Sequence, residues 1–257
     1  MTASSNTMIL DAATPVRPTV QSTRASLPTL VGLEVRKTLT TRSGRMLALA
    51  AALAGPAGMG LLEATGDGYL DVTGPFAVVG VMTGLLLLAL GVLSTAGEWT
   101  HRTAQTTYLL VPQRGRVLAA KTAAMALLGA GLTVVSAGLS WLVLAGLADA
   151  AVSWDGATQA ALTAVGAGMA FALVGVGVGA ATANAPAALT GLYLAILGLM
   201  QIIRAWDRQI ADAVDPAQAV LRFGRGDAEV ASLLTMGGWV LAALVAGWVL
   251  SRRRPVQ

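Results

Sequence analysis

The polar residues best suited to chemistry lie in one short segment, between Gly97 and Lys121. This segment holds the only histidine of the chain, His101, with Glu98 three residues before it. A carboxylate, an imidazole and a hydroxyl can perform acid–base or nucleophilic catalysis if they meet in a pocket that excludes water. His101 is instead followed by Arg102, at the end of a long apolar stretch rather than inside one. This position disfavours hydrolysis.

Other catalytic motifs are missing from the sequence. The chain has no cysteine, which excludes disulfides, thiolate nucleophiles and sulfur-ligated metals. It also has no glycine-rich loop with the lysine and hydroxyl that cradle nucleotide phosphates, so the chain is not expected to hydrolyse ATP by itself. The acidic segment around Glu63, Asp67 and Asp71 lacks the spacing of a calcium loop. We expect a solvated outer loop there, and no metal site.

The composition is that of a polytopic membrane protein. Of the 257 residues, 55% are apolar and only 12% are charged, against about 25% charged in soluble chains. At about 20 apolar residues per crossing helix, this content suffices for roughly six spans. In such a chain the net charge of +4 indicates topology rather than nucleic-acid binding. A soluble globular domain is excluded, and the expected surroundings are a lipid bilayer.

Six apolar stretches are predicted to cross the membrane, giving an all-α integral membrane protein. Residues 157–203 contain no charge, and one helix of that length would far exceed a bilayer core of about 30 Å. A turn is therefore predicted at Asn184–Pro186. The predicted spans are 46–62, 76–96, 122–147, 158–182, 187–203 and 230–250. No charged residue lies in the middle of any span, which disfavours ion-coupled transport and an intramembrane enzyme.

The segments outside these spans differ in character. Residues 1–26 are rich in Ser, Thr and Pro and are predicted to form a disordered cytoplasmic tail. Residues 27–45 repeat apolar residues every three or four positions, which predicts an amphipathic helix lying on the membrane surface. The long outer loop 204–229 is predicted to hold two short helices, the second capped by Asp215 with Pro216 at its first position.

Two glycine patterns and the basic residues add further expectations. The run Gly175, Gly177 and Gly179 is predicted to let helices pack closely, and the same role is expected for Gly166, Gly168 and Gly191. If the N-terminus is cytoplasmic, 13 of the 17 Lys and Arg residues lie on the cytoplasmic side. The sequence thus predicts a multi-pass protein of the plasma membrane with both termini in the cytoplasm.

Two segments of the sequence resemble one protein family. The strings Gly-Glu-Trp-Thr-His-Arg-Thr from Gly97 and Pro-Gln-Arg-Gly-Arg-Val-Leu-Ala-Ala-Lys from Pro112 resemble the link between spans two and three of type-2 ABC-transporter permeases from actinobacteria. That link usually reads Gly-Glu-Tyr-Arg-His-Gly-Thr and then Pro-Arg-Arg-x-x-Val-x-x-Ala-Lys. The matching positions are Glu98, His101, Thr103, Pro112, Arg114, Val117, Ala120 and Lys121, whereas Thr100, Arg102 and Gln113 depart. Upstream, Glu34–Ser43 resembles the family's Glu-x-x-Lys-Leu-Arg-Thr-Thr-Arg-Ser before span one.

The resemblance implies the permease subunit of an ATP-driven exporter. Such a permease pairs with a second permease, here a copy or a paralogue, and with two separate ATPase subunits that bind ATP and Mg²⁺. No cofactor is then expected in this chain. The resemblance places a coupling helix that docks on the ATPase at Glu98–Leu110. The residues it assigns to coupling are Glu98, Trp99, His101, Thr103, Pro112, Arg114, Arg116, Lys121, Glu34 and Lys37.

The cargo path is inferred from the same resemblance. Spans two and five line the path in the family, so the candidates are Phe76, Met82, Thr83, Tyr193, Met200 and Gln201. An uncharged lining suits an amphiphilic or apolar cargo, such as a peptide antibiotic, a drug-like metabolite or a lipid. The same side chains can instead be ordinary packing residues.

Simpler interpretations stand beside these assignments. Arg114, Arg116 and Lys121 can merely anchor the chain at the cytoplasmic surface. Glu98 is expected to be partly exposed, so that Glu98→Ala should leave expression near normal. The alternative function is a membrane scaffold or sensor that recruits a soluble regulator without transporting cargo.

Overall fold

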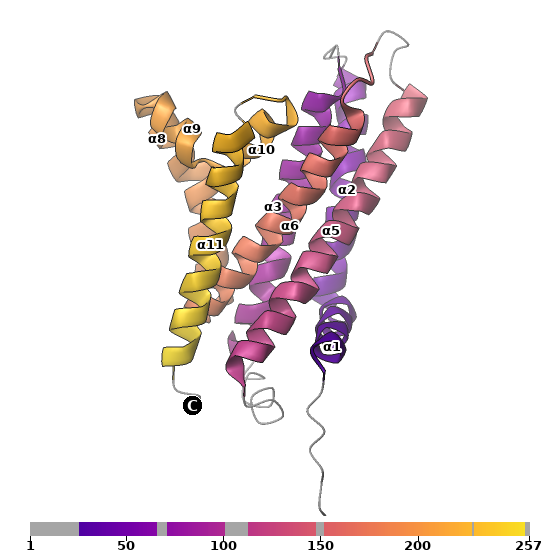
Figure 1. Ribbon diagram of the computed structural model, residues 1–257. Coiled ribbons are helices and arrows are strands. Elements are labelled where there is room, and N and C mark those ends of the chain that lie inside the picture. Colours follow the sequence, from indigo (N-terminus) through magenta and orange to yellow (C-terminus); the bar gives the residue numbers. More distant parts are fainter. Residues whose placement is uncertain (1–25, 66–70, 101–112, 148–151, 228, 255–257) are drawn as a thin grey trace, which may run out of the picture.

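The computed structural model describes residues 26–65, 71–100, 113–147, 152–227 and 229–254. Within these ranges the chain is a bundle of helices (Figure 1), and six helical stretches are long and apolar enough to cross a membrane. The protein is thus an all-α multi-pass membrane protein. The helices are α1 (Leu27–Thr40), α2 (Arg42–Thr65), α3 (Thr73–Thr100), α5 (Arg114–Leu147), α6 (Ala157–Thr182), α7 (Ala185–Tyr193), a π-helical segment (Leu194–Leu199), α8 (Met200–Trp206), α9 (Arg208–Val214), α10 (Pro216–Gly224) and α11 (Glu229–Arg253). Five of the six stretches are single helices, and the fifth span, Ala185–Trp206, comprises α7, the π-helical segment and α8.

The spanning helices extend past the apolar stretches that predict them. The largest difference is in α5, which begins at Arg114 rather than near residue 122, because a helix continues through polar residues as long as its backbone hydrogen bonds are satisfied. The predicted amphipathic helix 27–45 is also too long. Thr41 is extended and its hydroxyl accepts a hydrogen bond from the Gly44 backbone N–H at 3.1 Å. Residues 42–45 therefore belong to α2.

Helix α1 lies across one end of the bundle, below the spans in Figure 1. Ser26 caps its start by accepting a hydrogen bond from the Thr29 backbone N–H. Val35 and Leu39 on one face pack against a buried cluster to which α2, α3, α5 and α6 contribute, whereas Leu33 is 57% exposed. The helix is therefore amphipathic, as its spacing predicts, and its apolar face is held by the bundle.

Close packing of α3 against α6 forms the centre of the bundle. A Cβ atom at Gly175 would lie 2.1 Å from the Leu88 carbonyl oxygen, and one at Gly177 would lie 2.3 Å from the Ala243 carbonyl carbon of α11. Gly168 and Gly179 are similarly crowded, so the predicted packing role is confirmed for these four glycines. It is wrong for Gly166 and Gly191, where an added Cβ would meet no atom within 4 Å.

The predicted turn at Asn184–Pro186 is present. Helix α6 ends at Thr182, Ala183 has a left-handed φ of 52°, and the Asn184 side chain accepts a hydrogen bond from the Ala187 backbone N–H at 3.0 Å. The fifth span that follows is not a uniform α-helix. Its middle, Leu194–Leu199, is π-helical, a conformation that occurs often at functional sites and that the sequence does not signal.

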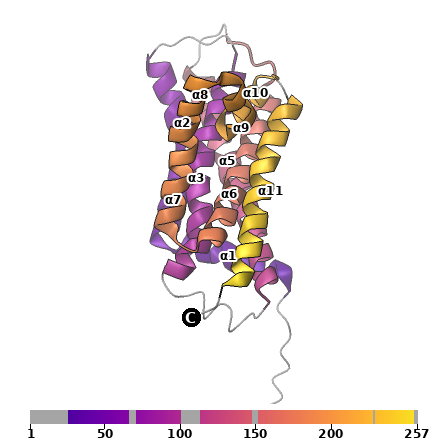
Figure 2. The same ribbon diagram turned by 90° about the vertical axis from the view of Figure 1, so that its left-hand side faces the viewer.

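Two short helices lie between the fifth and sixth spans, where the sequence predicts them (Figure 2). The Asp215 side chain caps α10 by accepting hydrogen bonds from the Ala217 and Gln218 backbone N–H groups at 2.9 and 3.2 Å. Asp207 caps α9 in the same way. Asp215 is also buried and accepts a hydrogen bond from Arg204 at 3.1 Å, so this connection is held back onto α8.

The acidic segment before α3 has a structural role in addition to its solvent exposure. Asp71 accepts hydrogen bonds from the Thr73 hydroxyl and, at 2.9 Å, from the Thr73 backbone N–H. These two bonds stabilise the carboxylate and lower the pKa of Asp71. Glu63, expected in the same loop, lies within α2.

Candidate functional site

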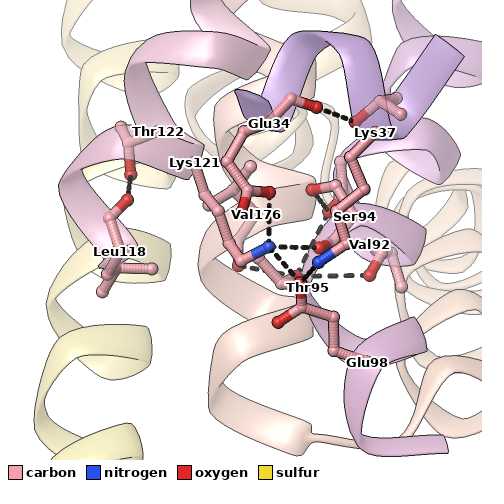
Figure 3. Close-up of polar contacts among 12 residues, drawn as sticks. Glu34, Lys37, Val92, Ser94, Thr95, Glu98, Leu118, Lys121, Thr122 and Val176 are labelled. Atoms are coloured by element: carbon pink, nitrogen blue, oxygen red, sulfur yellow. Dashed lines mark hydrogen bonds and ion pairs between the residues drawn. The ribbon is translucent and has the colours of Figure 1, made fainter. Parts of the chain in front are cut away.

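A cluster of four charged side chains lies where α1 meets the bundle (Figure 3). The Lys121 ammonium is 2.6 Å from Glu34 Oε2 and 2.7 Å from Glu98 Oε1, and Lys37 is also paired with Glu98. We call Glu34, Lys37, Glu98 and Lys121 the charge cluster. Its members come from α1, α3 and α5 and carry no net charge together.

The helices position these side chains by simple geometry. Glu34 and Lys37 are three residues apart on α1 and therefore share one face. Glu98 lies in the last turn of α3, and Lys121 in the second turn of α5. Lys121 also donates to the backbone carbonyl of Ser94 on α3 at 3.1 Å. Its three N–H donors thus have three acceptors.

Burial makes these contacts energetically important. The side chains of Lys121, Glu98 and Glu34 are 5%, 8% and 14% exposed, and only Lys37 is substantially exposed, at 43%. A buried ion costs several kcal/mol unless it is paired and hydrogen-bonded. Each buried charge therefore requires its partners. The cluster ties α1 to two spans, and Thr95, one turn before Glu98 on α3, adds a hydrogen bond to the Val176 carbonyl of α6 at 3.3 Å.

The expectation that Glu98 is partly exposed is wrong. The residue is 7% exposed and belongs to the continuous helix of span two, not to a separate helix after it. The rest of the predicted coupling helix, residues 101–110, lies outside the described part of the chain, and so do His101, Thr103 and Pro112.

The other predicted coupling residues have different surroundings. One guanidinium nitrogen of Arg114 donates to the backbone carbonyls of Ser251 and Arg254 at 3.0 and 2.7 Å, so Arg114 fastens the start of α5 to the end of α11. Arg116 donates to the side chain of Gln113 at 3.4 Å, near the surface. Trp99 is half-buried and, with Lys121 and Ser251, borders a small cavity. Of the ten predicted residues, the structure thus brings four into the charge cluster.

A cleft of about 300 Å³ lies beside the charge cluster. Glu34, Lys37 and Glu98 form part of its wall, and α2 contributes Ser43 and Gly44. The cleft and the cluster lie at the end of the bundle where α3 stops and α5 begins. This end of the bundle therefore combines the charge cluster with a cleft.

The candidate cargo-path residues do not share one surface. Phe76 is fully buried, with its ring centroid 6.3 Å from that of Trp141, and Thr83 is fully buried, with its hydroxyl 3.1 Å from the Ser136 hydroxyl. Met200 is buried as well. These three are enclosed within the single chain, because α2, α5 and α6 surround most of α3, and the inner face of the fifth span packs on the bundle. Their place on a cargo path stays a prediction.

The remaining three path candidates reach the surface or its margin. Met82 is 47% exposed, Gln201 is exposed, and Tyr193 is half-buried with its hydroxyl donating to the Leu85 carbonyl at 2.8 Å. Tyr193 and Gln201 flank the π-helical segment. A cargo surface on these helices would therefore lie on the outside of the single chain.

Among the described residues, no group of three or more His, Asp or Glu side chains is arranged to hold a metal ion. No protein-family model matches the chain, and no curated protein matches it in sequence.

Proposed function

We propose that this chain is the membrane-spanning permease subunit of an ATP-driven ABC exporter. The charge cluster is the observation that carries the proposal. It joins the interfacial helix α1 to spans α3 and α5 directly beside the α3–α5 connection, which is the segment whose sequence resembles the permease family. The segments that resemble the permease family and the charge cluster thus lie at the same end of the bundle.

The proposed mechanism is transmission of force through that end. A partner ATPase that binds ATP and Mg²⁺ pushes on the α3–α5 connection when it closes. Because separating the charge cluster would strand buried ions, α1, α3 and α5 move together. The glycine contacts between α3 and α6 pass this movement to the centre of the bundle. An amphiphilic or apolar cargo would then move along the exposed faces of α3 and the fifth span, between this chain and a second permease.

The proposed orientation places the charge cluster in the cytoplasm, with the chain in the plasma membrane. Of the 14 Lys and Arg residues in the described ranges, ten lie on α1, at the start of α2 and α5, or at the end of α11. The other four lie between Arg204 and Arg225 at the opposite end. A cytoplasmic excess of basic residues sets membrane orientation, which supports both termini facing the cytoplasm.

Cysteine labelling tests this orientation cleanly, because the native chain has no cysteine. Asp155 and Gln113 are both exposed and lie at opposite ends of the bundle. In intact cells Asp155→Cys should react with a membrane-impermeant maleimide, whereas Gln113→Cys should react only after permeabilisation. Labelling of Gln113→Cys in intact cells, with protection of Asp155→Cys, would reverse the orientation.

Purification from the native membrane tests the function itself. The tagged chain alone should hydrolyse no ATP, and the gently solubilised complex should contain a P-loop ATPase and hydrolyse ATP. Substituting the phosphate-loop lysine of that subunit should abolish hydrolysis and leave the complex intact. A stable complex with a soluble regulator that lacks a P-loop would favour the scaffold or sensor instead.

A further inference from the structure

A large apolar groove lies between α6, α10 and α11, apart from the charge cluster. Its volume is about 690 Å³, within the range of about 300–1,000 Å³ for ligand pockets. Its walls are formed mainly by apolar side chains, among them Leu162, Met169, Leu173, Phe223, Val240 and Leu241. The groove lies on two membrane-spanning helices, so the hydrocarbon of the bilayer is its natural surroundings.

The groove has one polar end and one apolar end. Gln159 and Ser232 lie in the first turns of α6 and α11, whereas Leu173 and Leu241 lie deeper along the same helices. At about 1.5 Å per residue, Gln159 to Leu173 spans about 21 Å and Ser232 to Leu241 about 14 Å. Half of a bilayer core measures about 15 Å. The groove thus matches one leaflet in length and in polarity.

Ser232 provides the second indication of a ligand. It is 1% exposed, and its hydroxyl oxygen is buried with no hydrogen-bond partner among the described residues. Thr163, also at the polar end, is satisfied by the Gln159 carbonyl at 2.8 Å. Because a buried polar group without a partner is costly, the Ser232 hydroxyl is a donor in need of an acceptor.

Two glycines keep the groove open. An added Cβ at Gly166 or Gly237 would meet no atom within 4 Å, and both residues line the groove. Because Gly166 faces this open groove, it does not take part in the close helix packing that the sequence predicts for it. An empty apolar groove facing lipid would forfeit contacts along its whole length.

We propose that this groove binds one acyl chain of a bilayer phospholipid. The Ser232 side chain turns its hydroxyl into the groove and donates a hydrogen bond to the ester carbonyl of that chain, and the hydrocarbon extends toward Leu173 and Leu241. A bound peptide fits less well, since its backbone polar groups would find few partners in this lining. The proposal is independent of any ATPase, so it can be tested on the chain alone.

Gly237 and Gly238 offer a matched pair of variants. Both positions are open to an added Cβ, and they are adjacent on α11, but only Gly237 lines the groove. The full chain is placed in nanodiscs of phosphatidylcholine and phosphatidylglycerol that contain a trace of phosphatidylcholine with a diazirine on one acyl chain. Irradiation should label the groove segments of α6 and α11. Gly237→Phe should reduce this labelling several-fold, whereas Gly238→Phe should label like the native chain.

Further variants separate a specific site from general lipid contact. Ser232→Ala should reduce labelling less than Gly237→Phe, because it removes the hydrogen bond and leaves the space. Gly166→Leu fills the groove from the α6 side and replaces Gly237→Phe if that variant does not fold, as judged by thermal unfolding. Equal labelling of the Gly237→Phe and Gly238→Phe variants would overturn the proposal. So would labelling spread evenly over the exposed faces of α2, α5 and the fifth span, which lie outside the groove.

Discussion

Glu98→Ala is expected to lower the free energy of unfolding by about 3–5 kcal/mol, the range measured when one partner of a buried ion pair is removed. Lys121 would remain 4% exposed with only Glu34 and the Ser94 carbonyl as partners. Lys37 would lose its acceptor too. The cost comes mainly from the buried Lys121 ammonium, which loses one counter-charge and one of its three acceptors.

Unfolding of the purified chain in mixed detergent micelles, followed by circular dichroism, measures this effect. Asp155→Ala is the control, since Asp155 is an exposed acid on the loop before α6 and its loss should change stability by no more than about 0.5 kcal/mol. If Glu98→Ala unfolds at the same denaturant concentration as the Asp155→Ala control, Glu98 is not a buried, paired carboxylate and the charge cluster does not exist as described.

The number and order of the spans follow from the sequence because hydrophobic length is a strong constraint in a bilayer. The same constraint, with Pro186, locates the turn between α6 and α7. Helix ends are less predictable, since Arg114 and its neighbours continue α5 through residues that look polar. The π-helical segment Leu194–Leu199 leaves no mark in the sequence, because its residues are as apolar as those of an α-helix.

The charge cluster was only partly predictable. Its four members all lie in the two segments that resemble the permease family, but Lys37 and Glu98 are 61 positions apart, and nothing in their spacing shows that they meet. One feature of the sequence did indicate burial: Lys121 is followed directly by an apolar stretch of the same predicted helix. The burial of the candidate cargo-path residues was not predictable either. Helix α3 is apolar on all sides, so the sequence does not distinguish Phe76, which is enclosed, from Met82, which is exposed.

The groove between α6, α10 and α11 could not be predicted, because each residue that lines it is common in membrane helices. A serine near a helix start and glycines within spans are typical of membrane helices. Only the three-dimensional arrangement shows that α10 and the ends of α6 and α11 leave a space between them and that one hydroxyl there lacks a partner.

The double variant Glu98→Leu with Lys121→Met is expected to retain the fold and to lose coupled transport. Replacing a buried ion pair by apolar residues of similar volume is often neutral or stabilising, so the unfolding free energy should lie within about 1 kcal/mol of the native value or above it. Glu34 and Lys37, three residues apart on α1, can then pair with each other. Helix α1 nevertheless loses its ionic link to α3 and α5, so its backbone amides should exchange hydrogen faster, while those of α3 and α6 should not.

In the proposed mechanism α1, α3 and α5 must move together, so a loosened α1 should abolish transport. In inverted vesicles that contain the complete complex, ATP-driven uptake of a fluorescent amphiphile should fall to background, while the ATPase continues at its basal rate. Arg36→Ala is the matched control, since Arg36 is exposed on α1 outside the charge cluster, and it should preserve uptake. If the double variant takes up the amphiphile at the native rate although its α1 amides exchange fast, the charge cluster only anchors α1 and does not transmit force. Force would then have to pass from the ATPase to the spans without α1.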